Sequence, residues 1–421
     1  MGRIVMKFGG TSVANLDRIR AAAAFVRREV DSGHSVAVVV SAMAGETNRL
    51  VELCRSAGEP APALDARDVE YDAVVASGEQ VTSGLMALVM QNLGYRARSW
   101  HGWQIPLRTD KDHGRARIDS IDDEALRDAV DSGEIAIVAG FQGVSPEGRI
   151  ATLGRGGSDT SAVALAAAIG AARCDIYTDV DGVYTTDPRI IKHARRIEKI
   201  SFEEMLEMAS LGAKVLQTRS VELAMAYKVP VRVLSSFDPP DAPGPGTLIC
   251  DEDDIVEKNI VTTVTPDFDD ATVTILAVPD EPGRAAAIFT ALAQGSVNID
   301  MIVQSASREA GFANISFTTK EVDLERAVAV LTPLQSKIGF KALQSDRHIA
   351  KVSVIGVGMK SHAGVAATMF KTLAEKGINI QNISTSEIKI SVLINSDAAE
   401  YAVRVLHEAY GLEGPSQAAR T

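Results

Sequence analysis

Residues 152–171 read TLGRGGSDTSAVALAAAIGA, a glycine-rich loop that runs directly into a stretch of small apolar residues. Glycines take positive φ angles without strain and let a ligand approach the backbone closely. The stretch after them predicts a buried helix, for which Ser158 or Asp159 is a candidate N-cap. The free N–H groups at such a helix start attract anions. An ordinary loop that caps a core helix is the competing interpretation, and the surrounding sequence has to decide between the two.

The segments on both sides of this loop alternate between apolar runs and helical patterns, from residue 3 to about residue 250. The runs read RIVMKF, SVAVVVSA, EIAIVAGF, CDIYTDV and VPVRVLS. Near-continuous apolar strands separated by helices predict an α/β domain with a mostly parallel sheet sandwiched by helices. Ligands of such sheets bind beyond the carboxyl ends of the strands, so the residues that follow strands are candidates for a functional site.

A break in this alternation comes at residues 235–250, SSFDPPDAPGPGTLIC. Four prolines and two glycines between positions 235 and 246 end helices and strands alike. The acidic segment that follows is typical of a solvated connection between domains. We therefore expect a first domain at residues 1–250, followed by a linker with a lead-in strand at residues 251–271.

The chain beyond the linker contains a repeat. The segments that begin at Val273 and Val352 both read as a strand, a small-residue loop, a helix and a second strand. Two copies of one α+β unit are the simplest explanation. The expected units span residues 272–346 and 347–421.

The composition describes a globular protein of two or three domains, with 421 residues, 46% of them hydrophobic and 23% charged. The net charge of −12 opposes nonspecific binding to nucleic acid or to anionic membranes. Cys54, Cys174 and Cys250 form neither a disulfide framework nor a zinc pattern, so we expect a reducing cytoplasm. We expect no signal peptide, no membrane span and no histidine metal site.

Lys7 lies at the end of the first predicted strand, within MKFGGTS. An ammonium group there would neutralise a transferring phosphoryl group, while the amides of Gly9 and Gly10 hold its oxygens. The order of residues is not that of a P-loop, and the spacing of a dinucleotide-binding loop is also absent. A surface lysine before a tight turn is the alternative interpretation.

Four further segments place polar residues after predicted strands or at helix starts. Thr47 could donate a hydrogen bond to a substrate oxygen or could be a helix N-cap. Glu79 could pair with a substrate ammonium group or could complement the dipole of the helix that begins there. Arg155 offers a two-pronged donor for a carboxylate, and Asp159 is placed to orient Lys7 or a magnesium–nucleotide complex. The segment YTDVDGVYTTDPR at residues 177–189 is a nucleotide-binding loop or a plain loop.

The segments KFGGTS, GRGGSDTSA and YTDVDGVYTTDP together resemble the signature segments of aspartate kinases, within the amino acid kinase superfamily. The repeated units resemble paired ACT domains, which bind amino acids at their interfaces. The resemblance runs from about Ile4 to about Gly411 and matches the domain order of the monofunctional enzymes. It implies phosphorylation of the β-carboxylate of L-aspartate by ATP. That carboxylate, with a pKa near ~4, is already ionised at neutral pH, so no general base is needed.

By this resemblance Lys7 is the phosphoryl-stabilising lysine and Asp159 the acid that organises it. Glu79 pairs with the α-ammonium group of the substrate and Arg155 with its α-carboxylate. The aspartate-binding set is Thr47, Glu79, Arg155 and Ser158. The nucleotide-binding set is Lys7, Phe8, Gly9, Gly10, Thr178, Asp179, Tyr184, Asp187 and Lys214. ATP is expected with Mg²⁺, which keeps much of its water shell, and no protein ligand of the metal is assigned.

The resemblance also implies feedback control by lysine, threonine or both through the ACT-like units, which we expect to associate between chains. Asp300 is expected to hold the ammonium group of an effector. The expected effector-binding set is Asp280, Gly283, Ala285, Asp300, Gln304, Asn379, Ser386 and Glu387. Ala363 stands where the family usually has proline, and Ser305 where asparagine is common. Other substrates of the superfamily (glutamate, acetylglutamate, carbamate and UMP) and an amino-acid sensor without kinase activity are the alternatives.

Overall fold

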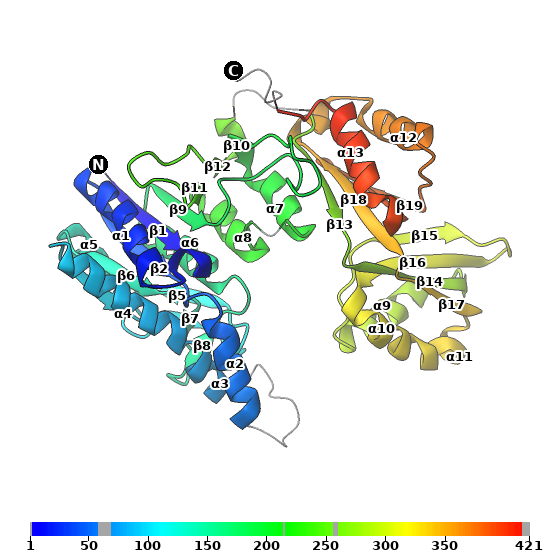
Figure 1. Ribbon diagram of the computed structural model, residues 1–421. Helices are drawn as coiled ribbons and strands as arrows, with labels where there is room; N and C mark the ends of the chain where they lie inside the picture. Colours follow the sequence, from blue (N-terminus) through cyan, green and yellow to red (C-terminus); the bar gives the residue numbers. More distant parts are fainter. Residues whose placement is uncertain (1, 58–68, 214, 256–259, 415–421) are drawn as a thin grey trace. The chain divides into compact units, whose positions relative to one another are not determined.

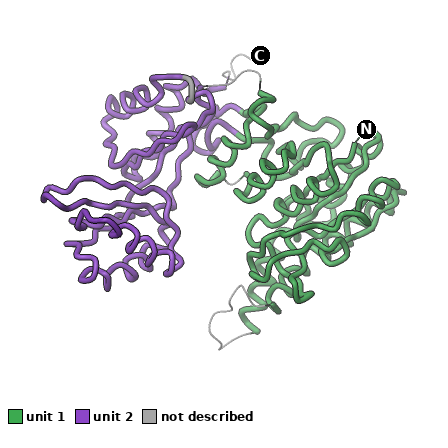
Figure 2. Tube along the Cα trace, turned by 180° about the vertical axis from the view of Figure 1, so that it is seen from behind, with its two compact units in different colours: residues 1–183, 196–257 green, residues 184–195, 258–421 purple. Residues whose placement is uncertain are grey.

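The computed structural model describes residues 2–57, 69–213, 215–255 and 260–414, which fall into two units (Figure 2). Unit 1 contains Met1–Val183 and Arg196–Glu257, and unit 2 contains Tyr184–Arg195 and Lys258–Thr421. The expected first domain, at residues 1–250, therefore does not form one continuous unit. The segment Tyr184–Arg195 leaves it and folds with the C-terminal repeats.

Unit 1 is built on an eight-stranded sheet in the order β10-β12-β11-β9-β1-β2-β6-β3. Its strands are β1 (Arg3–Phe8), β2 (Ser35–Val40), β3 (Ala97–Trp100), β6 (Ile135–Ala139), β9 (Arg173–Thr178), β10 (Lys199–Ser201), β11 (Val231–Ser235) and β12 (Thr247–Cys250). All neighbours pair in parallel except β11 and β12, which are antiparallel. The expected mostly parallel sheet is confirmed.

Helices cover both faces of this sheet (Figure 1). The side chains of Ile4, Met6 and Phe8 pack with α1 (Leu16–Asp31) and α4 (Ser77–Asn92) in one fully buried core. Successive residues of a strand point to opposite faces, so Lys7 faces the other way, towards α6. The other helices of unit 1 are α2 (Glu46–Ala57), α3 (Val69–Val75), α5 (Glu124–Asp131), α6 (Gly157–Ala168), α7 (Phe202–Ser210) and α8 (Thr218–Tyr227), with 3₁₀ turns η1 (Gly10–Val13) and η2 (Glu252–Asp254).

The stretch Val69–Asn92 is long and apolar enough by composition to cross a membrane, and half of it is buried inside the protein. It consists of two helices, α3 and α4, rather than one. Met86 and Met90 of α4 are fully buried in the core beneath the sheet. The stretch is therefore a pair of core helices.

A second, smaller sheet in unit 1 has the order β5-β4-β7-β8. Its strands are β4 (Leu107–Thr109), β5 (Ile118–Ile121), β7 (Gln142–Val144) and β8 (Ile150–Thr152). The antiparallel pair β7 and β8 forms a hairpin whose second strand leads into the glycine-rich loop. This small sheet therefore positions the start of the loop that carries Arg155.

Unit 2 contains two four-stranded sheets, in the orders β15-β16-β14-β17 and β13-β18-β20-β19. The first is made of β14 (Asp270–Pro279), β15 (Ile302–Ala306), β16 (Phe312–Lys320) and β17 (Ala342–Asp346), with helices α9 (Arg284–Gln294), α10 (Leu324–Leu331) and α11 (Gln335–Ile338) and turns η3 (Glu321–Asp323) and η4 (Thr332–Leu334). The second is made of β13 (Thr263–Asp267), β18 (Ile349–Ile355), β19 (Asn382–Thr385) and β20 (Lys389–Asn395), with helices α12 (Val365–Glu375) and α13 (Ala399–Ala409) and turns η5 (Val357–Ser361) and η6 (Ser396–Ala398).

The two sheets of unit 2 follow the predicted repeat. Gly283 and Gly364, at equivalent positions, precede α9 and α12 with φ angles of 95° and 106°. Such angles favour glycine, which explains why both copies keep it. The lead-in strand β13 pairs with β18 of the second sheet, so the second repeat contains a strand from outside its own copy.

The segment Tyr184–Arg195 packs within unit 2. Ile191 belongs to the apolar core of the second sheet and α13. The Thr185 hydroxyl group lies 2.9 Å from Nε2 of His407, which has no exposed surface. Burial, with the nearby charge of Arg195, lowers the pKa of His407 to about 4, so its ring is neutral at physiological pH. The segment is therefore anchored by both apolar and polar contacts.

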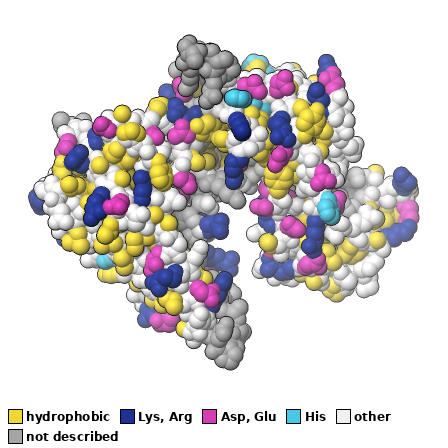
Figure 3. Space-filling model, in the orientation of Figure 1, with side chains coloured by type: hydrophobic (Ala, Val, Ile, Leu, Met, Phe, Trp, Pro, Cys, Tyr) yellow, Lys and Arg dark blue, Asp and Glu magenta, His cyan; other side chains and the backbone are white. Residues whose placement is uncertain are grey.

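Charged side chains are interspersed over the visible faces of both units (Figure 3). Lys and Arg side chains alternate there with Asp and Glu side chains instead of forming one continuous basic band. Charges of both signs interspersed in this way produce no large single-sign field on these faces.

Candidate functional site

Lys7 and Asp159 form a buried ion pair in unit 1. The Nζ atom of Lys7 lies 2.5 Å from Oδ1 of Asp159, and each residue is only 8% exposed. Lys7 is the penultimate residue of β1, and Asp159 lies in the first turn of α6. The pair therefore stands at the carboxyl edge of the central strand, where the sheet topology predicts a ligand site.

The start of α6 differs from the sequence expectation. The helix begins at Gly157, and its N-cap is Gly156, with a φ angle of 72°. Ser158 and Asp159 lie inside the first turn, so the prediction that one of them caps the helix is wrong. A left-handed φ angle at the N-cap favours glycine. Gly140, after β6, makes room for Ser158, because a Cβ atom on Gly140 would lie 2.9 Å from the Ser158 side chain.

Glu79 is a buried carboxylate, and only one of its two oxygens has a hydrogen-bond partner among the described residues. It is 3% exposed, and its Oε1 accepts a hydrogen bond of 3.0 Å from the amide of Ala42, directly after β2. Its Oε2 is buried without a hydrogen-bond partner among the described residues. Burial raises the pKa of Glu79 to about 7, against the lowering effects of the Ala42 amide and the charge of Lys7. An unsatisfied buried oxygen of this kind points to a missing donor.

Arg155 lies on the loop between β8 and α6 and is exposed. Within the described part of the chain its guanidinium makes no hydrogen bond or ion pair. Thr47 is half-buried in the first turn of α2, which begins at Glu46, so the expectation that Thr47 caps this helix is wrong. Both side chains are available to a ligand.

The residues after β1 are only partly available to a nucleotide. Phe8 has no exposed surface and stacks on Tyr177 with ring centroids 4.8 Å apart, so its side chain belongs to the core. The amide of Gly9 donates to the carbonyl group of Tyr177 over 3.1 Å and is not free for a phosphate. The expected role of the Gly9 amide is therefore wrong, and a nucleotide could meet Phe8 only through its backbone. Gly10 begins the turn η1, and no acceptor for its amide occurs among the described residues.

The other expected nucleotide residues are divided between the two units. Thr178 ends β9 and donates to the Oδ1 atom of the exposed Asp179 over 3.1 Å, in unit 1. Tyr184 and Asp187 belong to unit 2. A hydrogen bond from Arg189 holds the pKa of Asp187 below its usual value. Lys214 lies outside the described residues.

Comparison with known proteins identifies the family. The Amino acid kinase family matches residues 2–235, and an ACT domain matches residues 276–333 and 352–410. The chain is 49% identical over 419 residues to the aspartate kinase of Pseudomonas putida, which covers 99% of each chain. The chain belongs to the aspartate kinase family. The predicted family and the predicted ACT units are confirmed.

Two solved structures of this family are similar over nearly the whole chain. Escherichia coli aspartokinase III in complex with aspartate and ADP has a TM-score of 0.80 at 27% identity, covering 96% of this chain and 99% of that chain. The same enzyme in complex with lysine and aspartate, described as the T-state, has a TM-score of 0.73 at 28% identity, covering 96% of this chain and 98% of that one.

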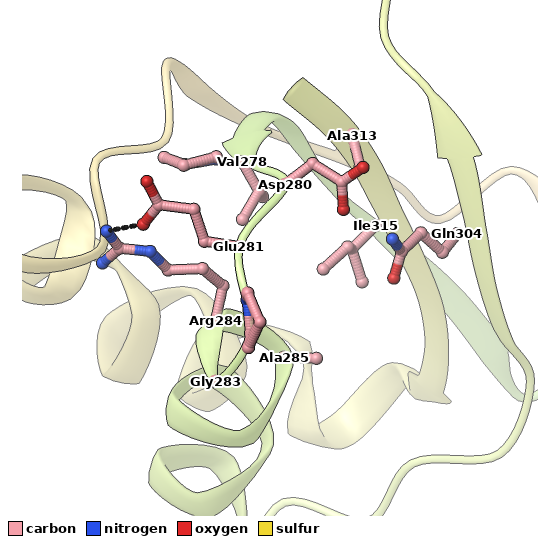
Figure 4. A pocket seen from close by; sticks show the side chains of 11 residues that line it. Val278, Asp280, Glu281, Gly283, Arg284, Ala285, Gln304, Ala313 and Ile315 are labelled. Carbon is pink, nitrogen blue, oxygen red and sulfur yellow. Dashed lines mark hydrogen bonds and ion pairs between the residues drawn. The ribbon is translucent and has the colours of Figure 1, made fainter. Parts of the chain in front are cut away.

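The first ACT unit of this aspartate kinase holds a cavity of about 320 Å³. Asp280, Gly283, Ala285 and Gln304, all expected at an effector site, line it. Figure 4 shows the Asp280 carboxylate and the Gln304 amide on the same side of the loop, above Ala285. Glu281 turns the other way and pairs with Arg284 over 2.7 Å (Figure 4).

Asp300 does not line this cavity. Its carboxylate lies 2.5 Å from Nζ of Lys351, which is 2% exposed and also pairs with Asp270 over 2.7 Å. The Oδ2 atom of Asp300 is therefore already paired with an ammonium of the protein, and the expectation that Asp300 holds an effector's ammonium stays a prediction. The three expected residues of the second ACT unit are Asn379, Ser386 and Glu387, which are exposed and lie outside this cavity.

The structure also has a cavity of about 580 Å³ that the sequence analysis did not predict. It lies at the equivalent loop of the second ACT unit, where His362, Ala363 and Gly364 line it together with Arg195. The repeat itself is the signal that would have pointed to it. Ala363, which replaces the usual proline, therefore lines a cavity wall.

The φ angles of two glycines provide a test of the loop that presents Arg155. Gly148, in the β7–β8 turn, and Gly156 both have left-handed angles, 73° and 72°. A Cβ atom on Gly148 would meet nothing within 4 Å, whereas one on Gly156 would lie 1.8 Å from Cγ of Gln217. Gly148→Ala should cost about 1 kcal/mol of unfolding free energy from the backbone alone. Gly156→Ala should cost about 1–3 kcal/mol more and should also lower kinase activity.

Chemical denaturation and the kinase rate measure both effects. Equal losses of stability in the two variants, with unchanged activity in Gly156→Ala, would contradict the assigned loop geometry.

Proposed function

We propose that this aspartate kinase transfers the γ-phosphoryl group of ATP to the β-carboxylate of L-aspartate, giving 4-phospho-L-aspartate and ADP. The observation that carries the proposal is the buried oxygen of Glu79, left without a partner within reach of the charge of Lys7. An ammonium group of an amino acid substrate would satisfy it. The relative from Escherichia coli that was solved with aspartate and ADP supports the same pair of ligands.

The reaction brings two anions together, so charge neutralisation and alignment are the main tasks. The ammonium of Lys7 stabilises the charge that develops on the transferring phosphoryl group. Asp159 keeps that ammonium in place through their 2.5 Å ion pair. The ionised β-carboxylate attacks directly, since it has no proton to lose at neutral pH.

Magnesium fits this site as a partner of ATP. Among the described residues no three His, Cys, Asp or Glu side chains gather into a metal-binding group. An ion that arrives on the phosphates and keeps several waters needs no such group, and Asp159 would be the candidate carboxylate to orient it. When bound, Mg²⁺ would supply positive charge that offsets the negative charge of the phosphates.

The two ends of the substrate are held by opposite charges. Glu79 receives the α-ammonium group, and the planar guanidinium of Arg155 receives the α-carboxylate. Thr47 and Ser158 supply hydroxyl groups to the carboxylate oxygens. This arrangement leaves the β-carboxylate free to face the phosphoryl group.

ADP release with each candidate substrate tests the proposal. Aspartate should support turnover, whereas glutamate, acetylglutamate, carbamate and UMP should not. Turnover with one of these four instead of aspartate, or no turnover at all, would refute the assignment.

Removal of the Lys7 ammonium tests the catalytic role. Lys7→Ala should lower kcat by about 10²-fold or more, the scale seen when one electrostatic donor is lost. Lys228→Ala is the matched control, because Lys228 is an exposed lysine of the same unit that pairs with Asp251. A folded Lys7→Ala protein with near-normal kcat would contradict the role.

The pKa of Glu79 predicts a pH dependence of aspartate binding. A carboxyl group with a pKa of about 7 is half protonated at pH 7, and only its ionised form pairs with an ammonium. The aspartate KM should therefore rise by about tenfold per pH unit below pH 7 and level off above it. Glu79→Gln should raise KM and abolish its change between about pH 6 and pH 8. A parent KM that is flat across this range would contradict the proposed contact.

We further propose feedback control by lysine, threonine or both, as expected for the first step of lysine, threonine and methionine synthesis. The cavity at Asp280 supports this proposal, as does the relative solved with lysine in its T-state. We also propose that the protein is a homo-oligomer in the cytoplasm. The edge strands β15 and β19 support association, because they expose Ile302 and Ile383.

Asp280→Asn tests the effector site. Asp280 lies in the cavity, and its side chain makes no ion pair among the described residues. The substitution should weaken inhibition by lysine or threonine about tenfold and leave the uninhibited kcat unchanged. Glu281→Gln is the matched control and should keep inhibition, because Glu281 faces Arg284. Insensitivity of the parent enzyme to both amino acids would refute the regulatory proposal.

A further inference from the structure

Asp72 on α3 is a fully buried carboxylate that the proposed reaction does not use. It has no exposed surface, accepts three hydrogen bonds and lies within hydrogen-bond distance of a histidine ring. Its Oδ2 accepts from the amide of Gly114 at 3.0 Å and from the amide of Thr152 at 2.9 Å, and it lies 2.8 Å from Nδ1 of His113. Its Oδ1 accepts from the Thr152 hydroxyl at 2.6 Å. A buried charge is costly unless hydrogen-bond donors surround it. These contacts therefore fix the position of the Asp72 carboxylate.

These hydrogen bonds fix the strand that leads to Arg155. Thr152 is the last residue of β8 and stands three positions before Arg155. Its neighbour Leu153 is held on both sides, since its amide donates to Phe141 at 2.9 Å and its carbonyl accepts from Arg219 at 2.7 Å. The base of the loop is therefore held by hydrogen bonds up to Leu153.

A second buried connection joins the same hairpin to the start of α4. The side-chain amide of Gln142 on β7 donates to the carbonyl group of Ala76 at 3.0 Å, and its oxygen accepts from Gln80 at 3.1 Å. Gln142 has no exposed surface. Gln80 directly follows Glu79, so the hairpin that presents Arg155 is tied to the helix that presents Glu79.

We propose that Asp72 is a positioning residue for substrate recognition. It holds the Arg155 loop at a fixed separation from Glu79, so that the α-carboxylate and the α-ammonium of one amino acid are bound together. The inference rests on the proposed roles of Arg155 and Glu79. Asp72 itself does not touch the substrate, and its effect passes through Thr152.

Two conservative variants weaken the hydrogen bonds around Asp72 without creating a cavity. Asp72→Asn keeps the shape but replaces charge-assisted hydrogen bonds with weaker neutral ones. Thr152→Val removes only the hydrogen bond from the hydroxyl group. Both should raise the aspartate KM, by about tenfold for Asp72→Asn and less for Thr152→Val, because a small misplacement of a binding group is enough. The ATP KM should stay within about twofold.

A shortened substrate separates positioning from a general loss of structure. β-Alanine keeps the amine and the reacting carboxylate of aspartate but lacks the α-carboxylate. In Asp72→Asn the kcat/KM for aspartate should fall about tenfold, while the value for β-alanine, or its inhibition constant against aspartate if turnover is too slow, stays unchanged. Equal losses for both compounds would overturn the proposal.

Asp175→Asn is the matched control. Asp175 is an equally buried aspartate on β9 of the same unit, held by Arg173 and Arg232. This variant should lose stability without changing the ratio of aspartate to β-alanine kcat/KM. A change in that ratio as large as the one in Asp72→Asn would show that any buried defect has the same effect, and would overturn the proposal.

The Arg155→Lys background distinguishes this inference from the function it rests on. If Arg155→Lys leaves the aspartate KM unchanged, the proposed role of Arg155 fails, whatever Asp72 does. If Arg155→Lys raises the KM, Asp72→Asn should add little to it, because both act on one contact. Full additivity of the two effects would refute positioning by Asp72 while leaving the role of Arg155 intact.

Discussion

The ion pair between Lys7 and Asp159 is the interaction on which the kinase unit depends. A buried ammonium and a buried carboxylate stabilise each other only at short range, so β1 and α6 must meet at one register. The left-handed N-cap at Gly156 and the close approach at Gly140 provide that register. The glycine-rich loop is thus a consequence of bringing a helix start onto the edge of a sheet beside a charged pair.

The sequence predicts the sheet and the residues at its edge well, because apolar strands and the loops after them obey local rules. The RIVMKF run becomes β1, and Lys7 meets Asp159 as expected. The start of α6 was not predictable in the same way. Ser158 and Asp159 are good N-cap residues, and only the left-handed φ angle of Gly156 and its close approach to Gln217 require glycine as the cap. Phe8 lies in the core because side chains alternate between the two faces of a strand. The KFGGTS motif by itself does not show which face Phe8 occupies.

Long-range contacts account for the other differences. Asp300 has the character of an ammonium-binding residue, and it does bind one, but that ammonium belongs to Lys351 of the other repeat. No local pattern shows such a pairing. Asp72 and Gln142 are missed for the same reason, because each is a single polar residue whose partners are far away in the sequence. Local patterns therefore identify the groups that meet ligands better than those that hold such groups in place.

The path of the chain between its two units has a consequence for dissection of the protein. Residues 184–195 leave the kinase unit, place Ile191 in the core of the second ACT sheet and return. A single proteolytic cut in the proline-rich segment would leave the two units joined through this excursion. A fragment that ends near residue 250 would expose Ile191 to water, and a fragment that begins near residue 258 would lack part of its core. The boundary between the domains in the sequence is therefore not a boundary between two parts that would fold independently.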